Sequence, residues 1–300
     1  MNRRRLIETL TSLLLVSVLI YFADLGRTVQ TLSKVKLEYY GLGVLLFLST
    51  YLASGRRWQI IAESTGHEMN LLDAIRVVAV SYSFNKLLPW NFGDMVRSKI
   101  SESYHNVESH GNILGGAGFE RVLDAASISF IIGVAAVFTT TGSQVTGTVA
   151  AFAAVFIIGA MLVYSGKLDG VIDHFPDRFS GFLEETLGGF RAVSLTELLE
   201  VLTLSQIKWW TEAIIFYVLA LSISSGLGFW DAAIVTSIMS VFSALPISPA
   251  GIGPGDAAAT GLLVYTGIPY STALSLVVLQ RTIGVMVQGV IGAIIYGFDL

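Results

Sequence analysis

Two arginines and two aspartates occupy matching positions in apolar parts of this chain. Each aspartate directly follows a glycine, and Arg121 comes 27 residues after Asp94 while Arg281 comes 25 residues after Asp256. A guanidinium deep in an apolar helix costs about 2.5–3.5 kcal/mol on insertion scales, so we expect it to have a partner or a function. Because the planar guanidinium can hold a phosphate through two parallel hydrogen bonds, the pattern predicts a site for a phosphate or carboxylate group.

Two more charged residues stand beside these four. Arg97 follows Asp94 by three residues and can share its helix face, and Glu120 directly precedes Arg121. These side chains either bind a substrate or form internal ion pairs, and Asp256 could instead cap a helix or carry a proton. The predicted substrate-binding residues are Arg281, Arg121, Asp256, Asp94, Arg97 and Glu120.

The segments that carry these residues occur twice. Residues 73–89 and 231–246 each run from an aspartate through an apolar stretch to Leu-Pro, and each then enters a loop that closes on Gly-Asp. Proline and glycine break helices, and unpaired backbone groups at membrane depth are tolerated only where they face protein or water. Duplicated breaks of this kind indicate a transporter's substrate site, although two simple turns are the alternative. The predicted hairpin breaks are Pro89, Gly93, Pro246, Pro249, Gly251, Gly253 and Gly255.

The composition is that of a membrane protein. The 300 residues are 53% hydrophobic and only 13% charged, whereas soluble domains carry about 25% charged residues. The net charge of −4 argues against nucleic acid as a partner. The absence of cysteine excludes disulfides and thiolate metal sites, the four histidines lack metal-ligand spacing, and no nucleotide-binding motif occurs, so we expect no metal or cofactor.

The charge distribution predicts an all-α integral membrane protein with an inverted-topology repeat. We expect about six full spans and two re-entrant hairpins, or about eight membrane segments, in a single polytopic domain of residues 1–300. Repeat one covers about residues 1–140, and repeat two covers about 141–300 with a cytoplasmic amphipathic loop at 165–200. Both termini are expected in the cytoplasm and the protein in the cell membrane. Lys34 and Lys36 are exceptions to this pattern, because they would lie outside.

Two clusters of basic and aromatic residues are interpreted as anchors at the membrane surface. Such side chains favour the headgroup region, where their apolar parts and polar tips can both be accommodated. The residues concerned are Arg56, Arg57, Trp58, Trp209 and Trp210.

The order and spacing of several motifs resemble a known family. The motifs are Gly93-Asp94-x-x-Arg97 after Pro89, then Glu120-Arg121-Val122-Leu123-Asp124, the loop at 245–256, and Arg281. Together they resemble the flippase-like family named for the transmembrane region of lysylphosphatidylglycerol synthases. Asp94 and Asp256 stand where that family commonly has glutamate.

The resemblance implies a protein that moves phosphate-bearing lipids between leaflets. It implies a lipid flippase or scramblase, or a component of one, rather than an enzyme, because this sequence contains no aminoacyl-transferase domain. Stand-alone archaeal relatives suggest a polyisoprenyl-phosphate-linked sugar as cargo and glycosylation proteins as partners. The alternatives are translocation of aminoacyl-phosphatidylglycerol or another phospholipid, a small-anion permease, a membrane-bound transferase, and a non-catalytic scaffold.

Overall fold

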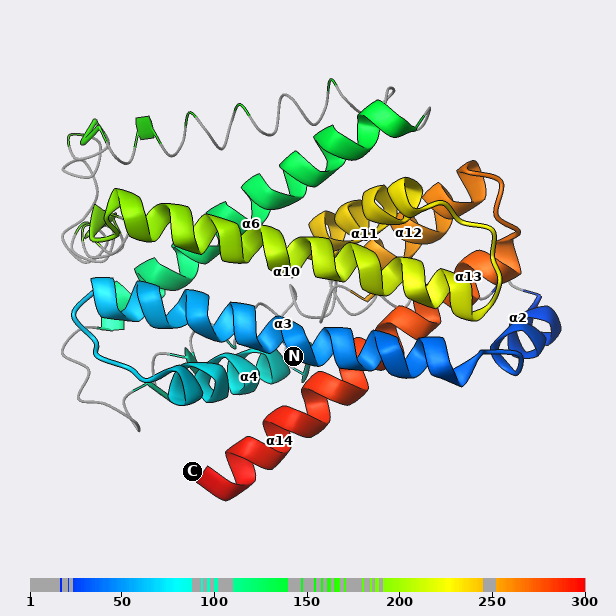
Figure 1. Cartoon of the computed structure of the whole chain (residues 1–300), viewed down its shortest axis with the longest axis horizontal. Helices are drawn as coiled ribbons and strands as arrows, with labels where there is room; N and C mark the ends of the chain where they lie inside the picture. The colour runs from blue at the N-terminus through cyan, green and yellow to red at the C-terminus, as the bar shows by residue number, and fades with distance from the viewer. Residues whose placement is uncertain are drawn as a thin grey trace.

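The computed structural model of the chain (Figure 1) describes residues 24–87, 110–139, 191–244 and 252–299, together with residues 17, 21, 93, 96–97, 100–101, 147, 154, 158, 161–162, 165–167, 170, 180, 184 and 187–188. The regular structure in these parts is helical, as the sequence predicts. The helices are α2 (Leu25–Leu32), α3 (Leu37–Ser64), α4 (Leu71–Leu87), α6 (His110–Phe138), α10 (Leu195–Ser222), α11 (Phe229–Ala244), α12 (Pro254–Tyr265), α13 (Tyr270–Thr282), the π-helical turn η2 (Ile283–Val287) and α14 (Gln288–Asp299).

The centre of the fold is the antiparallel pair formed by α3 and α10, which lie side by side along the long axis (Figure 1). At one end the Lys36 backbone N–H donates to the Ser222 carbonyl at 2.9 Å. At the other end the Arg56 Nη2 lies 2.9 Å from the Glu200 Oε1. Each helix has 28 residues and is therefore about 42 Å long, which exceeds the roughly 30 Å of a bilayer's hydrocarbon core.

Local sequence explains where the central helices begin and end. The Ser194 side chain accepts from the Glu197 backbone N–H while the Glu197 carboxylate accepts from the Ser194 N–H, a capping box that starts α10. The chain leaves α3 through Gly66 at φ 88°, a left-handed conformation that glycine adopts without strain. These signals lie in the sequence itself, so both boundaries follow from short-range chemistry.

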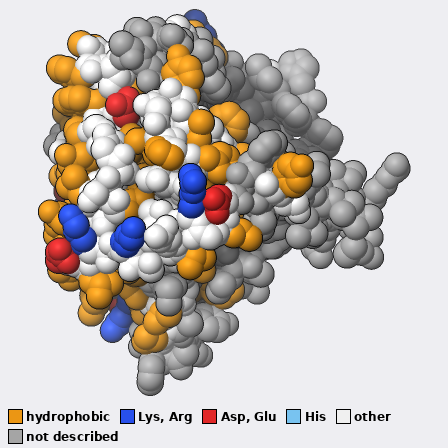
Figure 2. Space-filling model, turned by 90° about the vertical axis from the view of Figure 1, so that its right-hand side faces the viewer, with side chains coloured by type: hydrophobic (Ala, Val, Ile, Leu, Met, Phe, Trp, Pro, Cys, Tyr) orange, Lys and Arg blue, Asp and Glu red, His pale blue; other side chains and the backbone are white. Residues whose placement is uncertain are grey.

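The outer face of α3 is apolar. Leu42, Leu45, Leu48 and Leu52 recur at helical spacing, and all four side chains are exposed. Hydrophobic side chains also gather along one flank of the molecule in Figure 2. A continuous apolar stripe on a long helix suits contact with lipid rather than water.

Two helical segments among the described residues are long and apolar enough to cross a membrane. They are Gly115–Phe138, with a mean hydropathy of 1.8, and Tyr270–Ile291, with a mean hydropathy of 1.6. The second segment runs through α13, η2 and the start of α14. The expected count of six spans remains a prediction, and the expected first span at residues 6–22 lies outside the described residues.

The second expected hairpin corresponds to α11 and α12, which pack against each other. Gly253, at φ 104°, precedes α12, and Pro254 and Gly255 form its first turn. Proline is favoured at this position because the first helical N–H has no intrahelical acceptor. The breaks predicted at Pro89, Pro246, Pro249 and Gly251 lie outside the described residues.

The buried core joins helices from both halves of the chain. Trp58 and Ile61 of α3 pack in one cluster with Val77 of α4 and with Phe216 and Leu219 of α10, all at most 1% exposed. Helix α4 also packs on α14, and α11 packs on α6. Each half therefore supplies a helix that packs on the other half.

Candidate functional site

Arg281 and Asp256 form a close ion pair, called here the Arg281 pair. The Arg281 Nε lies 2.6 Å from the Asp256 Oδ1, and its Nη2 donates to the Ser243 Oγ of α11 at 3.2 Å. The Arg281 side chain remains 17% exposed and the Asp256 side chain 10% exposed. The pair thus joins α11, α12 and α13 inside an apolar part of the fold and keeps a small accessible area.

Asp256 also closes the start of α12. Its Oδ2 accepts the Gly253 backbone N–H at 2.9 Å, while Oδ1 faces Arg281. Asp256 is therefore not the N-cap of α12. Gly253 is the N-cap, and Asp256 lies in the first turn of the helix. The carboxylate is held from two sides, which fixes the position of Arg281.

The helix that carries Arg281 is irregular directly after it. The π-helical turn η2 begins at Ile283, two residues beyond Arg281. Such turns are rare and occur frequently at functional sites. On the other side, the Gln280 Nε2 donates to the Glu212 Oε2 of α10 at 3.4 Å. Polar contacts therefore connect the surroundings of Arg281 to the central helix pair.

A second set of charged side chains lies in the interior and is called here the Arg57 cluster. It consists of Arg57, Arg97, Glu120, Asp124 and Lys208. Arg57 bridges both carboxylates, with its Nε 3.1 Å from the Glu120 Oε1 and its Nη1 2.5 Å from the Asp124 Oδ1. Arg97 Nη1 contacts the other Glu120 oxygen at 2.5 Å.

The position of the two carboxylates explains why cations gather around them. Glu120 and Asp124 are one turn apart on α6, so their like charges share a face and destabilise the helix unless cations lie between them. Arg57 from α3 and Lys208 from α10 supply those cations, with the Lys208 Nζ 3.4 Å from Asp124. The cluster ties α3, α6 and α10 together through charge.

Aromatic rings and hydroxyls complete the environment of this cluster. The Arg97 guanidinium lies 4.3 Å from the centre of the Trp58 ring, and its Nε donates to the Ser81 Oγ at 3.3 Å. The Trp209 Nε1 donates to the Asp124 Oδ1 at 2.8 Å. The Lys208 ammonium lies 4.4 Å from the Trp209 ring. Stacking on aromatic faces stabilises cations that have lost contact with water.

The chain is similar to known proteins over nearly its whole length. The family model described as the lysylphosphatidylglycerol synthase TM region matches residues 6–292. The chain belongs to this family. A UPF0104 membrane protein of Pyrococcus horikoshii is 20% identical, and the match covers 94% of this chain and 93% of the relative. A UPF0104 membrane protein of Methanocaldococcus jannaschii is 24% identical, with 71% of this chain and 92% of the relative covered.

Family membership confirms the expected relationship and the assignment to the membrane. The matched model is the transmembrane region of a lipid synthase, and both relatives are described as membrane proteins. Together these descriptions support a membrane function related to lipids. In a member of this family, an arginine within an apolar span is a candidate contact for a lipid headgroup.

The structure places the predicted substrate residues in two different settings. Arg281 and Asp256 form the Arg281 pair, whereas Arg97 and Glu120 lie in the Arg57 cluster and are at most 2% exposed. Arg121, on the same helix, is 43% exposed, and its Nη1 lies 3.9 Å from the Asp124 Oδ2. Asp94 lies outside the described residues. Arg281 and Arg121 are therefore the arginines of the predicted set that keep exposed surface.

The interpretation of Arg57 and Trp58 as surface anchors is wrong. Both side chains are 1% exposed, because Arg57 pairs with the carboxylates of α6 and Trp58 packs in the core. Trp209 and Trp210 are half-buried; Trp209 bonds to Asp124, and Trp210 stacks with Phe229. Arg56 alone keeps an exposed position, paired with Glu200.

The sequence analysis did not predict the Arg57 cluster, because it did not identify Arg57 and Lys208 as ion-pair partners of Asp124. One signal was available, because two carboxylates one turn apart in an apolar helix require nearby cations. Among the described residues, no group of three or more histidine, aspartate or glutamate side chains is arranged to hold a metal ion.

Proposed function

We propose that this protein translocates a phosphate-bearing lipid across the membrane, most specifically a polyisoprenyl-phosphate-linked sugar. The observation that carries the proposal is the position of Arg281, which lies in an apolar segment long enough to span the membrane and is paired with Asp256 at the start of a restarted helix. A guanidinium within a membrane span is unfavourable in free energy, and binding an anion that crosses the membrane would explain why it is there.

The lipid's phosphate would contact Arg281 while its tail stays in the surrounding hydrocarbon. The Arg281 Nη2 can donate to a phosphate oxygen in place of the Ser243 hydroxyl. The ion pair with Asp256 would keep the arginine in position during this exchange. The turn η2 directly after Arg281 is a point where the helix can change its winding as the two halves move. Membership of a lipid-synthase membrane family supports a lipid as the cargo.

We propose further that the two halves form an inverted-topology repeat. Helices α3 and α10 have the same length and antiparallel directions, and the intervals from Leu37 to Leu195 and from Leu71 to Phe229 are both 158 residues. This interval supports a duplication, and the antiparallel pair supports opposite orientation of the copies. Alternating access would then arise from one half moving against the other around the Arg281 pair.

The transport test uses Arg281→Gln in reconstituted liposomes that contain a fluorescent polyisoprenyl-phosphate sugar. We expect the rate of leaflet exchange to fall on the order of ten-fold to hundred-fold, since a hydrogen bond to a charged group contributes about 1.5–3 kcal/mol. Arg56→Gln is the matched control, because that arginine belongs to an exposed pair, and its exchange rate should equal that of the unmodified protein.

A double variant separates binding from structural pairing. Arg281→Gln combined with Asp256→Asn removes both charges of the Arg281 pair, so a purely structural ion pair predicts recovery of transport. We expect the double variant to stay folded and inactive. Recovery of exchange, or loss in the Arg56→Gln control of the same size, would contradict the proposed role. Exchange of phosphatidylglycerol but not the sugar lipid would redirect the proposal to phospholipid cargo.

Orientation can be tested by cysteine labelling, because the natural chain has no cysteine. Glu68 lies in the connection between α3 and α4, and Ser271 lies at the start of α13. We expect a membrane-impermeant maleimide to label Glu68→Cys only from the cytoplasmic side and Ser271→Cys only from outside. Labelling of both positions from one side would contradict the proposed topology.

A further inference from the structure

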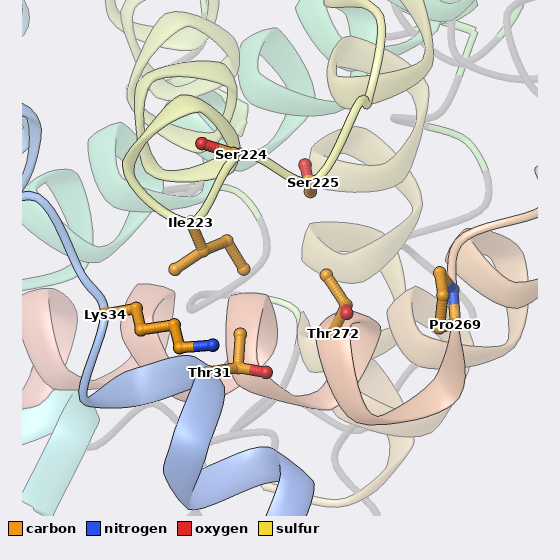
Figure 3. Close-up of a pocket in the computed structure, with 7 residues that line it drawn as sticks. All are labelled: Thr31, Lys34, Ile223, Ser224, Ser225, Pro269 and Thr272. Carbon is orange, nitrogen blue, oxygen red and sulfur yellow. The ribbon is translucent and has the colours of Figure 1, made fainter.

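A cavity of about 310 Å³ opens at the end of the bundle where α2, α10 and α13 meet. Its lining includes Lys34, Thr31, Ser225 and Thr272, and the labelled side chains frame the space in Figure 3. This volume is at the lower end of the roughly 300–1,000 Å³ typical of ligand pockets. The cavity belongs to neither the Arg281 pair nor the Arg57 cluster.

The chemistry of the lining favours an anion. Lys34 supplies an ammonium group, four further residues supply hydroxyl groups around it, and none of the lining residues is acidic. Figure 3 shows the Lys34 side chain extending toward Thr31 and the open space. Among the ion pairs of the described residues, none involves Lys34, so its charge is not already neutralised by a neighbouring carboxylate. Such an ammonium can bind a phosphate oxygen.

The walls of this cavity are held in place by the backbone. Helix α2 ends at Leu32, and the Lys34 N–H donates to the Thr31 carbonyl at 3.1 Å, which presents the side chain beyond the helix end. Two residues further on, the Lys36 backbone N–H donates to the Ser222 carbonyl at the end of α10. Thr272 stands in the first turn of α13, where the helix dipole adds partial positive charge.

The position of the cavity relates it to Arg281. Thr272 and Arg281 lie on the same helix, nine residues apart, which corresponds to about 14 Å along the axis. The Arg57 cluster is farther away, because Lys36 and Arg57 are separated by 21 residues, or about 30 Å along α3. Figure 2 views the molecule from the cavity end and shows Lys or Arg side chains among polar and backbone surface.

We propose that this cavity is a phosphate-binding site, built around Lys34, that holds the anionic headgroup of the lipid before or after it passes Arg281. The identification of the natural ligand as a lipid rests on the proposed function, whereas the inference that the site binds phosphate rests on the cavity alone. The site also gives a reason for a lysine on the side where the positive-inside rule disfavours it. A lipid phosphodiester and free phosphate share this chemistry, and the test separates them.

The test uses Ser225→Cys as a reporter, since a single cysteine in this chain is unique and Ser225 lines the cavity. Maleimide labelling is measured in nanodiscs of phosphatidylcholine, of phosphatidylcholine with phosphatidylglycerol, and of phosphatidylcholine with inorganic phosphate in solution. We expect phosphatidylglycerol to slow labelling at least about five-fold. In Lys34→Gln, we expect the phosphatidylglycerol content needed for half of that protection to rise roughly ten-fold. Lys36→Gln is the control, because Lys36 lies outside the cavity.

Each outcome bears on the proposal. Protection by the anionic lipid alone supports a headgroup site that needs the membrane, and protection by both ligands supports a site that recognises phosphate itself. No protection by either ligand, or equal protection in Lys34→Gln, overturns the site. Protection that persists while no lipid moves in the liposome assay contradicts the proposed transport but not the site. Arg281-dependent transport without protection contradicts the site alone.

Discussion

Glu120→Gln is expected to lower the free energy of unfolding by about 3–5 kcal/mol, the cost typical of breaking a buried ion pair from one side. Glu120 contacts both Arg57 and Arg97, and all three side chains are at most 3% exposed. The amide keeps the shape of the carboxylate but removes its charge. Two buried guanidinium groups and Lys208 would then face Asp124 as the only remaining carboxylate of the Arg57 cluster.

The measurement is unfolding by denaturant in detergent micelles, followed by circular dichroism. Glu200→Gln is the matched control, because Glu200 makes an ion pair with Arg56 in which the side chains are 40% and 46% exposed. Exposed pairs contribute only about 0–1 kcal/mol, so the control should unfold close to the unmodified protein. Equal stability of the two variants would show that the Arg57 cluster does not hold the helices together.

A second substitution tests the cause of the loss. Arg97→Gln in the Glu120→Gln background removes the guanidinium that pairs with Glu120 in the unmodified protein, and we expect it to restore part of the lost stability. The coupling between the two changes should reach about 0.5–3 kcal/mol, as measured by a double-mutant cycle. Additive losses would indicate that Glu120 acts through something other than its charge.

What the sequence could predict depended on short-range causes. The helix restart near Asp256 follows from proline and glycine, and the pairing of Asp256 with Arg281 was one of the expected alternatives because a hairpin brings neighbouring segments together. The detail differed, since Gly253 rather than Asp256 is the N-cap. Each of these features is decided by residues at most 28 positions apart, on α12 and the helix that follows it, where spacing limits the possible contacts.

What the sequence could not predict depended on contacts between distant segments. Arg57 lies in a motif that looks like a surface anchor, yet its partner Asp124 is 67 residues away and lies on another helix. Trp209 contacts the same carboxylate from 85 residues away. Composition near Arg57 cannot reveal such a partner, because the burial of a charge is decided by which helices pack together.

Gly93→Ala is expected to destabilise the protein by about 1–3 kcal/mol or more, as overpacking of a tight contact does, and to abolish the proposed lipid transport. A Cβ at Gly93 would lie 1.8 Å from the Ser81 carbonyl oxygen of α4, a backbone atom that cannot rotate away. The Ser81 Oγ already accepts from Arg97 and donates to the Gly93 carbonyl. Displacement of Gly93 would therefore also disturb Arg97 in the Arg57 cluster.

The measurement combines unfolding in detergent with the liposome exchange assay. Gly261→Ala is the control, because a Cβ at Gly261 in α12 meets nothing within 4 Å. Alanine at such a helical position should be neutral or stabilise by up to about 1 kcal/mol. If Gly93→Ala matched this control in both assays, the close approach of this segment to α4 would not matter for folding or transport.

Gly255 makes the corresponding contact in the second half, and the correspondence sharpens the prediction. Its Cβ would lie 2.1 Å from the Ser243 Oγ and 2.8 Å from the Met239 carbonyl, whereas Gly93 approaches Ser81 and Asn85. Met239 and Ser243 lie 158 residues after Ser81 and Asn85, the interval that also separates the helix pairs.

Because the Ser243 hydroxyl can rotate, Gly255→Ala should cost less stability than Gly93→Ala. It should still reduce exchange, because Ser243 is a partner of Arg281. Loss of exchange in a stably folded Gly255→Ala protein would therefore link the repeated glycine contact to the Arg281 pair.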